Sequence, residues 1–291
     1  MTSNSLDSTS NQPLQPSQLN IHAQGMTFAT QAWGDPASPP VLALHGWLDN
    51  SASFYRLAPL LSNHYVVALD TAGHGLSDHR RHQEPYNIWQ DVGEVFAIAD
   101  EMGWEQFALL GHSRGAIIST LCAGTFPERI THLGLLDGFM PQPVPPEKAP
   151  EQLAKSIIEN RQVKTHSVYK DRQLMVRARM VGLWALSSEA AGALVERGSK
   201  AVEGGYCWRS DPRLTTASAL KLSPEQVAAF VNRVQAPAKL ILAEEGLLSR
   251  FEDALAVPES WSMERLPGNH HFHMEEQVED ISGILNRFLG C

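Results

Sequence analysis

Five short apolar runs, separated by stretches of amphipathic pattern, are the feature that most limits how this chain can fold. The runs are 41–44, 66–69, 107–110, 133–136 and 240–243. Uninterrupted apolar runs of this length are typical of strands buried on both faces. Residues 88–99 and 278–288 carry apolar side chains at helical spacing, and 19–34 has the pattern of two further strands. Alternating strands and helices predict an α/β fold with a mostly parallel central sheet flanked by helices.

Residues 141–222 depart from this alternation. The segment opens with four prolines among six residues, then becomes helical in pattern, and has no run typical of a buried strand. Its 13 Lys and Arg against 8 Asp and Glu give it a net charge of +5, so that the remainder of this −9 chain carries −14. We interpret 141–222 as an inserted helical cap over an α/β core formed by 19–140 and 223–291, with 1–18 as a flexible tail. A basic cap could steer acidic substrates, but solvated helix faces are the simpler explanation.

Composition excludes several classes of function. The net charge of −9 argues against a nucleic-acid partner, which would need a basic face. No apolar run approaches the roughly 20 residues that span a bilayer, and the polar N-terminus lacks the pattern of a secretory signal. Three widely spaced cysteines, Cys122, Cys207 and Cys291, form no metal or redox pair and favour a reduced, cytoplasmic protein.

The strongest chemical signal is the pattern Gly-x-Ser-x-Gly at 111–115, directly between the run 107–110 and a helical stretch, 116–126. A serine at such a sharp turn is lifted above the sheet, needs small neighbours, and lies at a helix N-terminus that stabilises negative charge. Ser113 is therefore the predicted nucleophile. The alternative is a serine that only caps the helix.

The oxyanion formed in acyl transfer needs two hydrogen-bond donors fixed in advance. We expect them to be the backbone N–H of Arg114, the residue after the nucleophile, and that of Trp47 in the motif at 45–50. His45 is then expected to brace this loop. The glycine-rich motif at 70–78 is expected to be scaffold, because it lacks the Gly-Lys-Ser/Thr ending of a phosphate loop.

The general base should follow the last strand, where 267–275 contains three histidines. His270 is the predicted base and His271 the alternative. The spacing His-His-x-His could suggest a metal, but no other ligand motif completes a site, so no metal and no cofactor are predicted. The carboxylate that orients the base is left open between Asp137, after the run 133–136, and Glu244 or Glu245, after 240–243.

Together these motifs resemble the α/β-hydrolase fold family over essentially 21–289. Within it, the segments 45–50, 135–139, 242–246 and 268–273 look most like the serine hydrolase-like protein group. The resemblance implies Ser113 as nucleophile, Trp47 and Arg114 as oxyanion positions, and His270 as base, with Asn269 where the family usually has Gly. The family's common acid position is filled here by Gly246. Some relatives, such as the haloalkane dehalogenases, place the acid before the cap, where Asp137 stands, and this favours Asp137 over Glu245.

The expected function is hydrolysis of an ester-type bond (carboxylic ester, thioester or lactone) in a small-molecule substrate, through an acyl-enzyme. Trp184 and Trp208 in the cap are candidates to line the substrate pocket. A nucleophilic serine argues against the aspartate-dependent dehalogenases and epoxide hydrolases of this fold. Amide or C–C bond hydrolysis, a cofactor-free haloperoxidase, and a catalytically silent binding protein remain alternatives.

Overall fold

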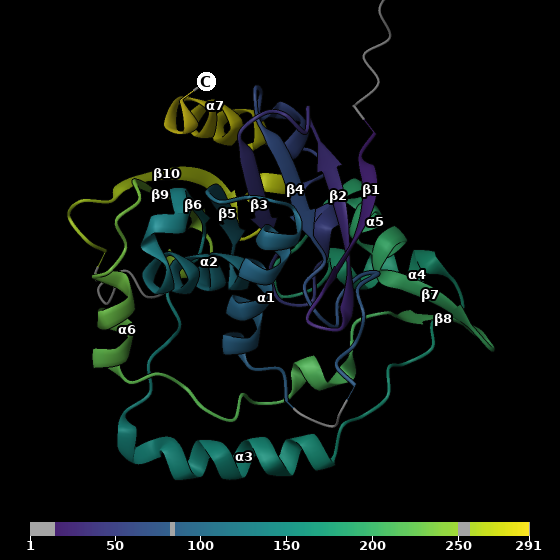
Figure 1. Ribbon diagram of the computed structural model, residues 1–291. Coiled ribbons are helices and arrows are strands. Elements are labelled where there is room, and N and C mark those ends of the chain that lie inside the picture. Colours follow the sequence, from purple (N-terminus) through teal and green to yellow (C-terminus); the bar gives the residue numbers. More distant parts are fainter. Residues whose placement is uncertain (1–14, 82–84, 250–256, 291) are drawn as a thin grey trace, which may run out of the picture.

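A single eight-stranded sheet forms the centre of the computed structural model, which describes residues 15–81, 85–249 and 257–290. Its strands lie in the order β1-β2-β4-β3-β5-β6-β9-β10. Pairing is antiparallel for β1–β2 and β2–β4 and parallel across the rest of the sheet. The predicted α/β-hydrolase sheet is thus present, with the two extra strands antiparallel at one edge (Figure 1). The strands are β1 (Ser17–Ala23), β2 (Met26–Trp33), β3 (Pro40–Leu44), β4 (Tyr65–Leu69), β5 (Phe107–His112), β6 (Ile130–Leu136), β9 (Ala238–Glu245) and β10 (Ser262–Asn269).

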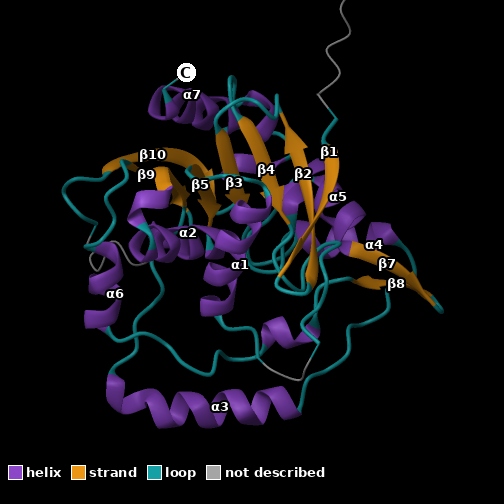
Figure 2. Ribbon diagram, in the orientation of Figure 1, coloured by secondary structure: helices purple, strands orange, loops and turns teal. Residues whose placement is uncertain are grey.

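Helices cover both faces of this sheet, as its apolar strands require (Figure 2). In β3, Leu42 and Leu44 pack into one apolar cluster and Val41 and Ala43 into another on the opposite face, because successive side chains alternate across a strand. The first cluster includes residues of α1, α2 and α6, and the second includes residues of α7. The helices of the core are α1 (Ile88–Glu101), α2 (Arg114–Thr125), α6 (Pro224–Val231) and α7 (Val278–Leu289).

The segment 141–222 holds helices and also a small β-hairpin that the sequence analysis did not anticipate. Its elements are α3 (Ala149–Arg161), α4 (Arg172–Met180), α5 (Ser188–Gly198), β7 (Ser199–Val202) and β8 (Gly205–Trp208). Gly204 and Gly205 turn the hairpin with φ of 84° and 148°, in a region that favours glycine. A pair of glycines between two short β-forming runs is the signal that was missed.

The inserted segment has two differently anchored parts. α4, α5 and the hairpin form their own apolar cluster at one side of the molecule, whereas α3 lies apart at the lower edge of Figure 1. Ser156 is the only buried residue of α3. Two hydrogen bonds join α3 to 217–218: Gln152 Nε2 donates to Ser218 O at 2.6 Å, and Ala217 N donates to Glu159 Oε2 at 2.7 Å.

At the N-terminus, β1 begins at Ser17, so the last two residues of the expected tail belong to the sheet. The first 14 residues of that tail lie outside the described residues, as does Cys291. Among the helices that are described, none combines the length and apolar character needed to cross a bilayer.

Candidate active site

Ser113 occupies the turn between β5 and α2 with φ 52° and ψ −115°, a strained conformation for a residue other than glycine. Its backbone N–H donates to Leu136 O at 2.9 Å, which ties the turn to the end of β6. Gly115 makes the turn sterically feasible, because a Cβ there would overlap the carbonyl oxygen of Leu44 on β3. The local sequence therefore places the serine hydroxyl at the carboxyl edge of the sheet, as the strand–turn–helix pattern predicts.

His270 follows β10 and reaches Ser113 directly. Its Nε2 lies 2.8 Å from Ser113 Oγ, and its ring is buried. The indole of Trp184, from the cap, packs on this ring with centroids 5.2 Å apart. His271 faces away from Ser113, since its Nε2 lies 3.1 Å from Asp49 Oδ2. Of the two candidate bases, His270 is the one in hydrogen-bond contact with the serine.

Asp137 completes this chain of hydrogen bonds. Its Oδ2 lies 2.5 Å from His270 Nδ1 and accepts a second hydrogen bond from the backbone N–H of Leu247 at 2.6 Å. The carboxylate is fully buried, whereas Glu244 and Glu245 are exposed at the end of β9. Gly246 leaves the room for it, because a Cβ at that position would overlap the Asp137 carboxylate. Because Gly246, at the family's common acid position, has no side chain, the Asp137 carboxylate has the space that it needs.

The two expected oxyanion residues stand on adjoining loops. β3 and β5 pair in parallel, so Trp47 follows the end of one strand and Arg114 the end of its neighbour. The indole Nε1 of Trp47 donates to Leu214 O at 2.9 Å and fastens its loop to the inserted segment. His45 braces the same loop, as expected: its Nε2 accepts from Thr71 N at 3.1 Å, and burial lowers its pKa, which keeps it neutral.

The motif at 70–78 acts as scaffold in this structure. The buried Asp70 carboxylate accepts hydrogen bonds from the backbone N–H groups of Ser51 and Leu76 and pairs with Arg197 of α5 at 2.8 Å. It therefore links the loop after β3, the loop after β4 and the cap. None of the side chains of residues 70–78, which the structure describes in full, forms a hydrogen bond with the Ser113 hydroxyl.

Three further histidines pack around His270. His112 Nε2 lies 2.8 Å from the His270 carbonyl oxygen, and its ring centroid lies 4.2 Å from that of His273. Burial and the neighbouring histidines hold the pKa of both His112 and His273 well below the usual value. Burial alone would raise the pKa of Asp49, but Arg179 of α4 and His271 outweigh it and keep that pKa well below the usual value.

Asp49, His112 and His271 also bring one ligand atom each within 4.8 Å of one another. One carboxylate and two imidazoles are ligands that zinc accepts. Here the Asp49 carboxylate already pairs with Arg179 and His271, which balances its charge without an ion. The absence of a metal therefore stays a prediction.

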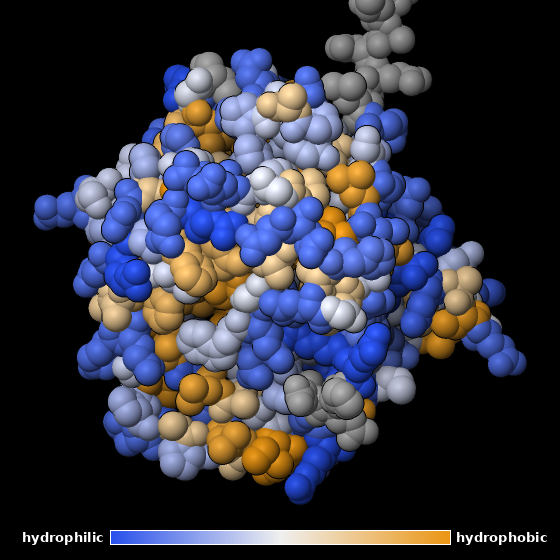
Figure 3. Space-filling view, in the orientation of Figure 1, coloured by the Kyte–Doolittle hydropathy of each residue, from blue (hydrophilic) through white to orange (hydrophobic). Residues whose placement is uncertain are grey.

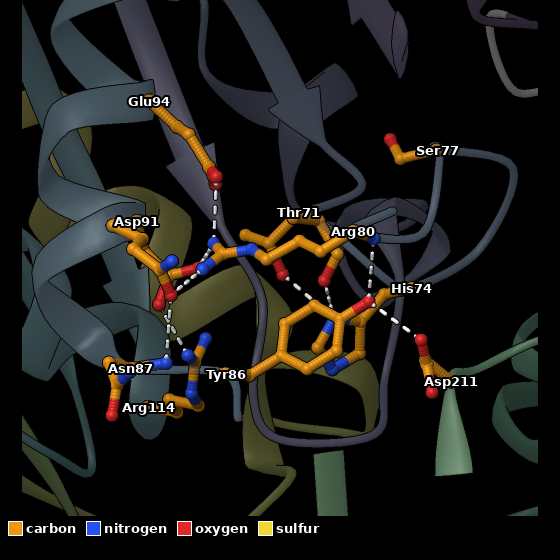
Figure 4. Close-up of polar contacts among 12 residues, drawn as sticks. Thr71, His74, Ser77, Arg80, Tyr86, Asn87, Asp91, Glu94, Arg114 and Asp211 are labelled. Atoms are coloured by element: carbon orange, nitrogen blue, oxygen red, sulfur yellow. Dashed lines mark hydrogen bonds and ion pairs between the residues drawn. The ribbon is translucent and has the colours of Figure 1, made fainter. Parts of the chain in front are cut away.

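A second polar network extends from the Arg114 side chain to α1 (Figure 4). Arg114 pairs with Asp91 at 2.5 Å, and Arg80 joins Asp91 at 3.4 Å and Glu94 at 2.7 Å. Burial and the neighbouring Asp91 charge raise the pKa of Glu94 to about 7. Tyr86 continues the network, with its hydroxyl donating to Asp211 Oδ2 of the inserted segment at 2.9 Å. These contacts could not be predicted from the sequence, because their partners on α1, on α2 and in the segment before α1 lie at no characteristic spacing.

Two cavities flank the serine. One, of about 470 Å³, is lined by Ser113, Phe139, Met140, Leu247 and Leu248 among others. The other, of about 480 Å³, lies between α1 and the inserted segment and is lined in part by Trp47 and Arg114.

The two cap tryptophans that the sequence analysis singled out lie in different places. Trp184 packs on the His270 ring. Trp208 packs against Tyr169 with centroids 6.3 Å apart and lines a small separate cavity with Asp49 and Arg179. The structure thus sets Trp208 among the packing residues of the cap.

A match to a family model, described as alpha/beta hydrolase fold, covers residues 39–245, and the chain belongs to this family. Serine hydrolase-like protein 2 of Homo sapiens is 33% identical and aligns over 94% of each chain. A serine hydrolase-like protein of Danio rerio is 30% identical over 89% of this chain and 84% of its own. The resemblance to the serine hydrolase-like group is thus confirmed.

Two solved structures extend the comparison. A hypothetical protein from Pseudomonas aeruginosa PAO1 has 39% identity and a TM-score of 0.89, and the alignment covers 96% of this chain and all of that one. The thioesterase domain from the curacin biosynthetic pathway has 25% identity and a TM-score of 0.81 over 93% of this chain and 99% of that domain.

Proposed function

We propose that this protein is a serine hydrolase that cleaves ester-type bonds through an acyl-enzyme. The observation that carries the proposal is the continuous chain of hydrogen bonds from buried Asp137 through His270 to Ser113. A carboxylate, an imidazole and a hydroxyl in this order are the groups that nucleophilic acyl transfer needs. Hydrolysis as a class agrees with the family to which the chain belongs.

In the proposed reaction, His270 Nε2 takes the proton of the Ser113 hydroxyl as Oγ attacks the carbonyl carbon of the substrate. The backbone N–H groups of Trp47 and Arg114 donate to the oxyanion of the tetrahedral intermediate. Asp137 stabilises the charged His270, which then passes the proton to the leaving alcohol or thiol. A water molecule, deprotonated by His270, attacks the acyl-enzyme; the bond between the acyl carbon and Ser113 Oγ breaks, His270 returns the proton to Oγ, and the acid is released. This scheme uses no metal and no organic cofactor.

The proposed substrates include thioesters as well as carboxylic esters. The similar domain from the curacin pathway is a thioesterase, and both bonds present the same carbonyl carbon to a serine.

The test is hydrolysis of a short-chain p-nitrophenyl ester by the wild-type protein and by Ser113→Ala. We expect the rate to fall by about 10³-fold or more, because the nucleophile is removed. Full activity in the alanine variant would overturn the proposal. Labelling with a fluorophosphonate tests the alternative of a silent binding protein, since only an activated Ser113 should form the adduct.

A further inference from the structure

The two cavities beside Ser113 differ in chemistry. The first is walled by residues that follow β6 and β9, among them Phe139, Met140, Leu247 and Leu248, and its lining has no charged side chain among the described residues. The second combines the aromatic side chains of Trp47 and Trp89 with four charged groups. One cavity is therefore suited to an aliphatic group and the other to a polar group with an apolar stem.

Both cavities meet at the proposed reaction centre. Ser113 lines the first and Arg114, the next residue, lines the second, while Ile117, Pro141 and Gln142 contribute to both. A carbonyl group held between Ser113 Oγ and the proposed oxyanion donors therefore has one cavity for each of its two substituents. At about 470 and 480 Å³, each cavity has a volume in the range of small-molecule sites.

The charge in the second cavity is predominantly positive. Lys155 of α3 and Lys221 line it together with Arg114, whose guanidinium is already paired with Asp91. Glu159 of α3 is the only carboxylate among its described lining residues. Glu159 lies 3.7 Å from Lys155 and also accepts the Ala217 N–H. The surrounding segment 141–222 is net positive in a chain that is otherwise strongly negative. Figure 3 shows the setting: apolar side chains gather in the middle of this face, next to a strongly hydrophilic area.

We propose that the substrate is an ester or thioester with an aliphatic group on one side of the carbonyl and an anionic group, a carboxylate or a phosphate, on the other. The aliphatic group occupies the cavity of Phe139 and Leu248, and the anion lies near Lys155 and Lys221 in the other. Lys155 and Lys221 are both exposed residues, and cations clustered along a cleft raise the local concentration of an anionic substrate. This proposal rests on the serine hydrolase function proposed above.

The experiment compares esters of one shape that differ only in charge. One pair is the hexanoyl esters of 4-hydroxybenzoate and of 4-hydroxybenzamide. A second pair places the charge on the acyl side, as the p-nitrophenyl monoester of adipic acid and its terminal amide. We expect the charged member of at least one pair to have a kcat/KM about three- to tenfold higher, with the advantage shrinking in high salt. The hexanoyl ester of 4-hydroxyphenyl phosphate then separates a preference for phosphate from one for carboxylate.

Reversing the charge of the two lysines tests whether they cause the preference for the charged substrate. The variant Lys155→Glu combined with Lys221→Glu should abolish or invert the ratio of charged to neutral substrate. Lys200→Glu combined with Lys170→Glu is the matched control, because both lysines belong to the inserted segment but line neither cavity. The control should keep the wild-type ratio, since it changes the net charge equally.

Two results would overturn the inference: no preference for charge in either pair, or an equal change of ratio in the control. Both presuppose hydrolysis that depends on Ser113. Should Ser113→Ala retain the activity, the proposed hydrolase function itself fails, and the two failures are thereby distinguished.

Discussion

The two sides of Ser113 differ in how many charged groups they contain and how these groups are paired. On the side of His270, four histidines lie together, burial favours the neutral form of His112 and His273, and an ion pair joins Asp49 to Arg179. On the side of the proposed oxyanion donors, charged groups are fixed in pairs, with Arg80 and Arg114 against Asp91 and Glu94 (Figure 4).

The difference follows from what each side has to do in the proposed reaction. A base has to gain and lose a proton, and neutral histidines beside it oppose its charged form less than unpaired cations would. Oxyanion donors have to stay in position while charge develops, and buried ion pairs hold the surrounding elements in place. Single substitutions on each side of Ser113 test this division.

Asp137→Asn should have the largest effect. The amide keeps the shape of the side chain but removes the charge that stabilises protonated His270, so kcat should fall by about 10³- to 10⁴-fold. Steady-state ester hydrolysis measures it. Glu245→Gln, at the other candidate acid, is the matched control and should keep wild-type activity, since this side chain is exposed. Equal losses in the two variants would remove Asp137 from the proposed triad.

Gly246→Ala should come next. The added methyl group overlaps the Asp137 carboxylate, so the acid must shift and the contact with His270 must lengthen. A misplacement of this size typically costs about 10- to 100-fold in kcat. Gly192→Ala on α5 is the control, because a Cβ there meets nothing within 4 Å. Unchanged kcat in Gly246→Ala, at unchanged stability, would argue against a tightly positioned acid.

Asp91→Asn tests the other side of the comparison. Loss of the ion pair with Arg114 should loosen the first turn of α2 and lower kcat by about tenfold, with little change in KM. Asp100→Asn is the control: it removes the same charge from α1, but its side chain is 63% exposed and pairs with Arg129 away from the site. A rise in KM at constant kcat would instead mean that Asp91 acts through substrate binding.

Glu94→Gln should change the pH dependence of stability. The pKa of Glu94 is raised to about 7 in the folded protein, from 4.5 for the free group. The cost of ionising it is absent below about pH 4.5, grows with rising pH, and is complete above about pH 7. Between pH 6 and 7, the wild type should therefore lose about 1 kcal/mol of unfolding free energy relative to the variant. Urea unfolding at the two pH values measures this, and a parallel response of both proteins would contradict it.

Much of the fold follows from local sequence, and much of the site does not. The apolar runs and the strand–turn–helix context of Ser113 are local, so both could be predicted. The choice between Asp137 and Glu245 depends on three-dimensional placement: β6 and β9 are neighbours in the sheet, and the φ of 43° at Asp137 aims its side chain at His270.

The paired charges beside Arg114 were also beyond sequence reasoning, because they depend on how α1 packs against α2. The hairpin of β7 and β8 is a different case, since its glycine pair was visible. The helical pattern of residues 141–222 as a whole favoured a purely helical prediction, even though Gly204 and Gly205 indicate a turn between two strands.

The fit between Gly246 and Asp137 has an evolutionary consequence. The ends of β6 and β9 are adjacent, so either could supply a carboxylate to the same imidazole nitrogen, but the space admits only one. A lineage that exchanges one arrangement for the other must therefore pass through an ancestor with two crowded, mutually repelling acids or with none. A search for a carboxylate at the position of Gly246 alone would therefore miss the acid proposed for this chain.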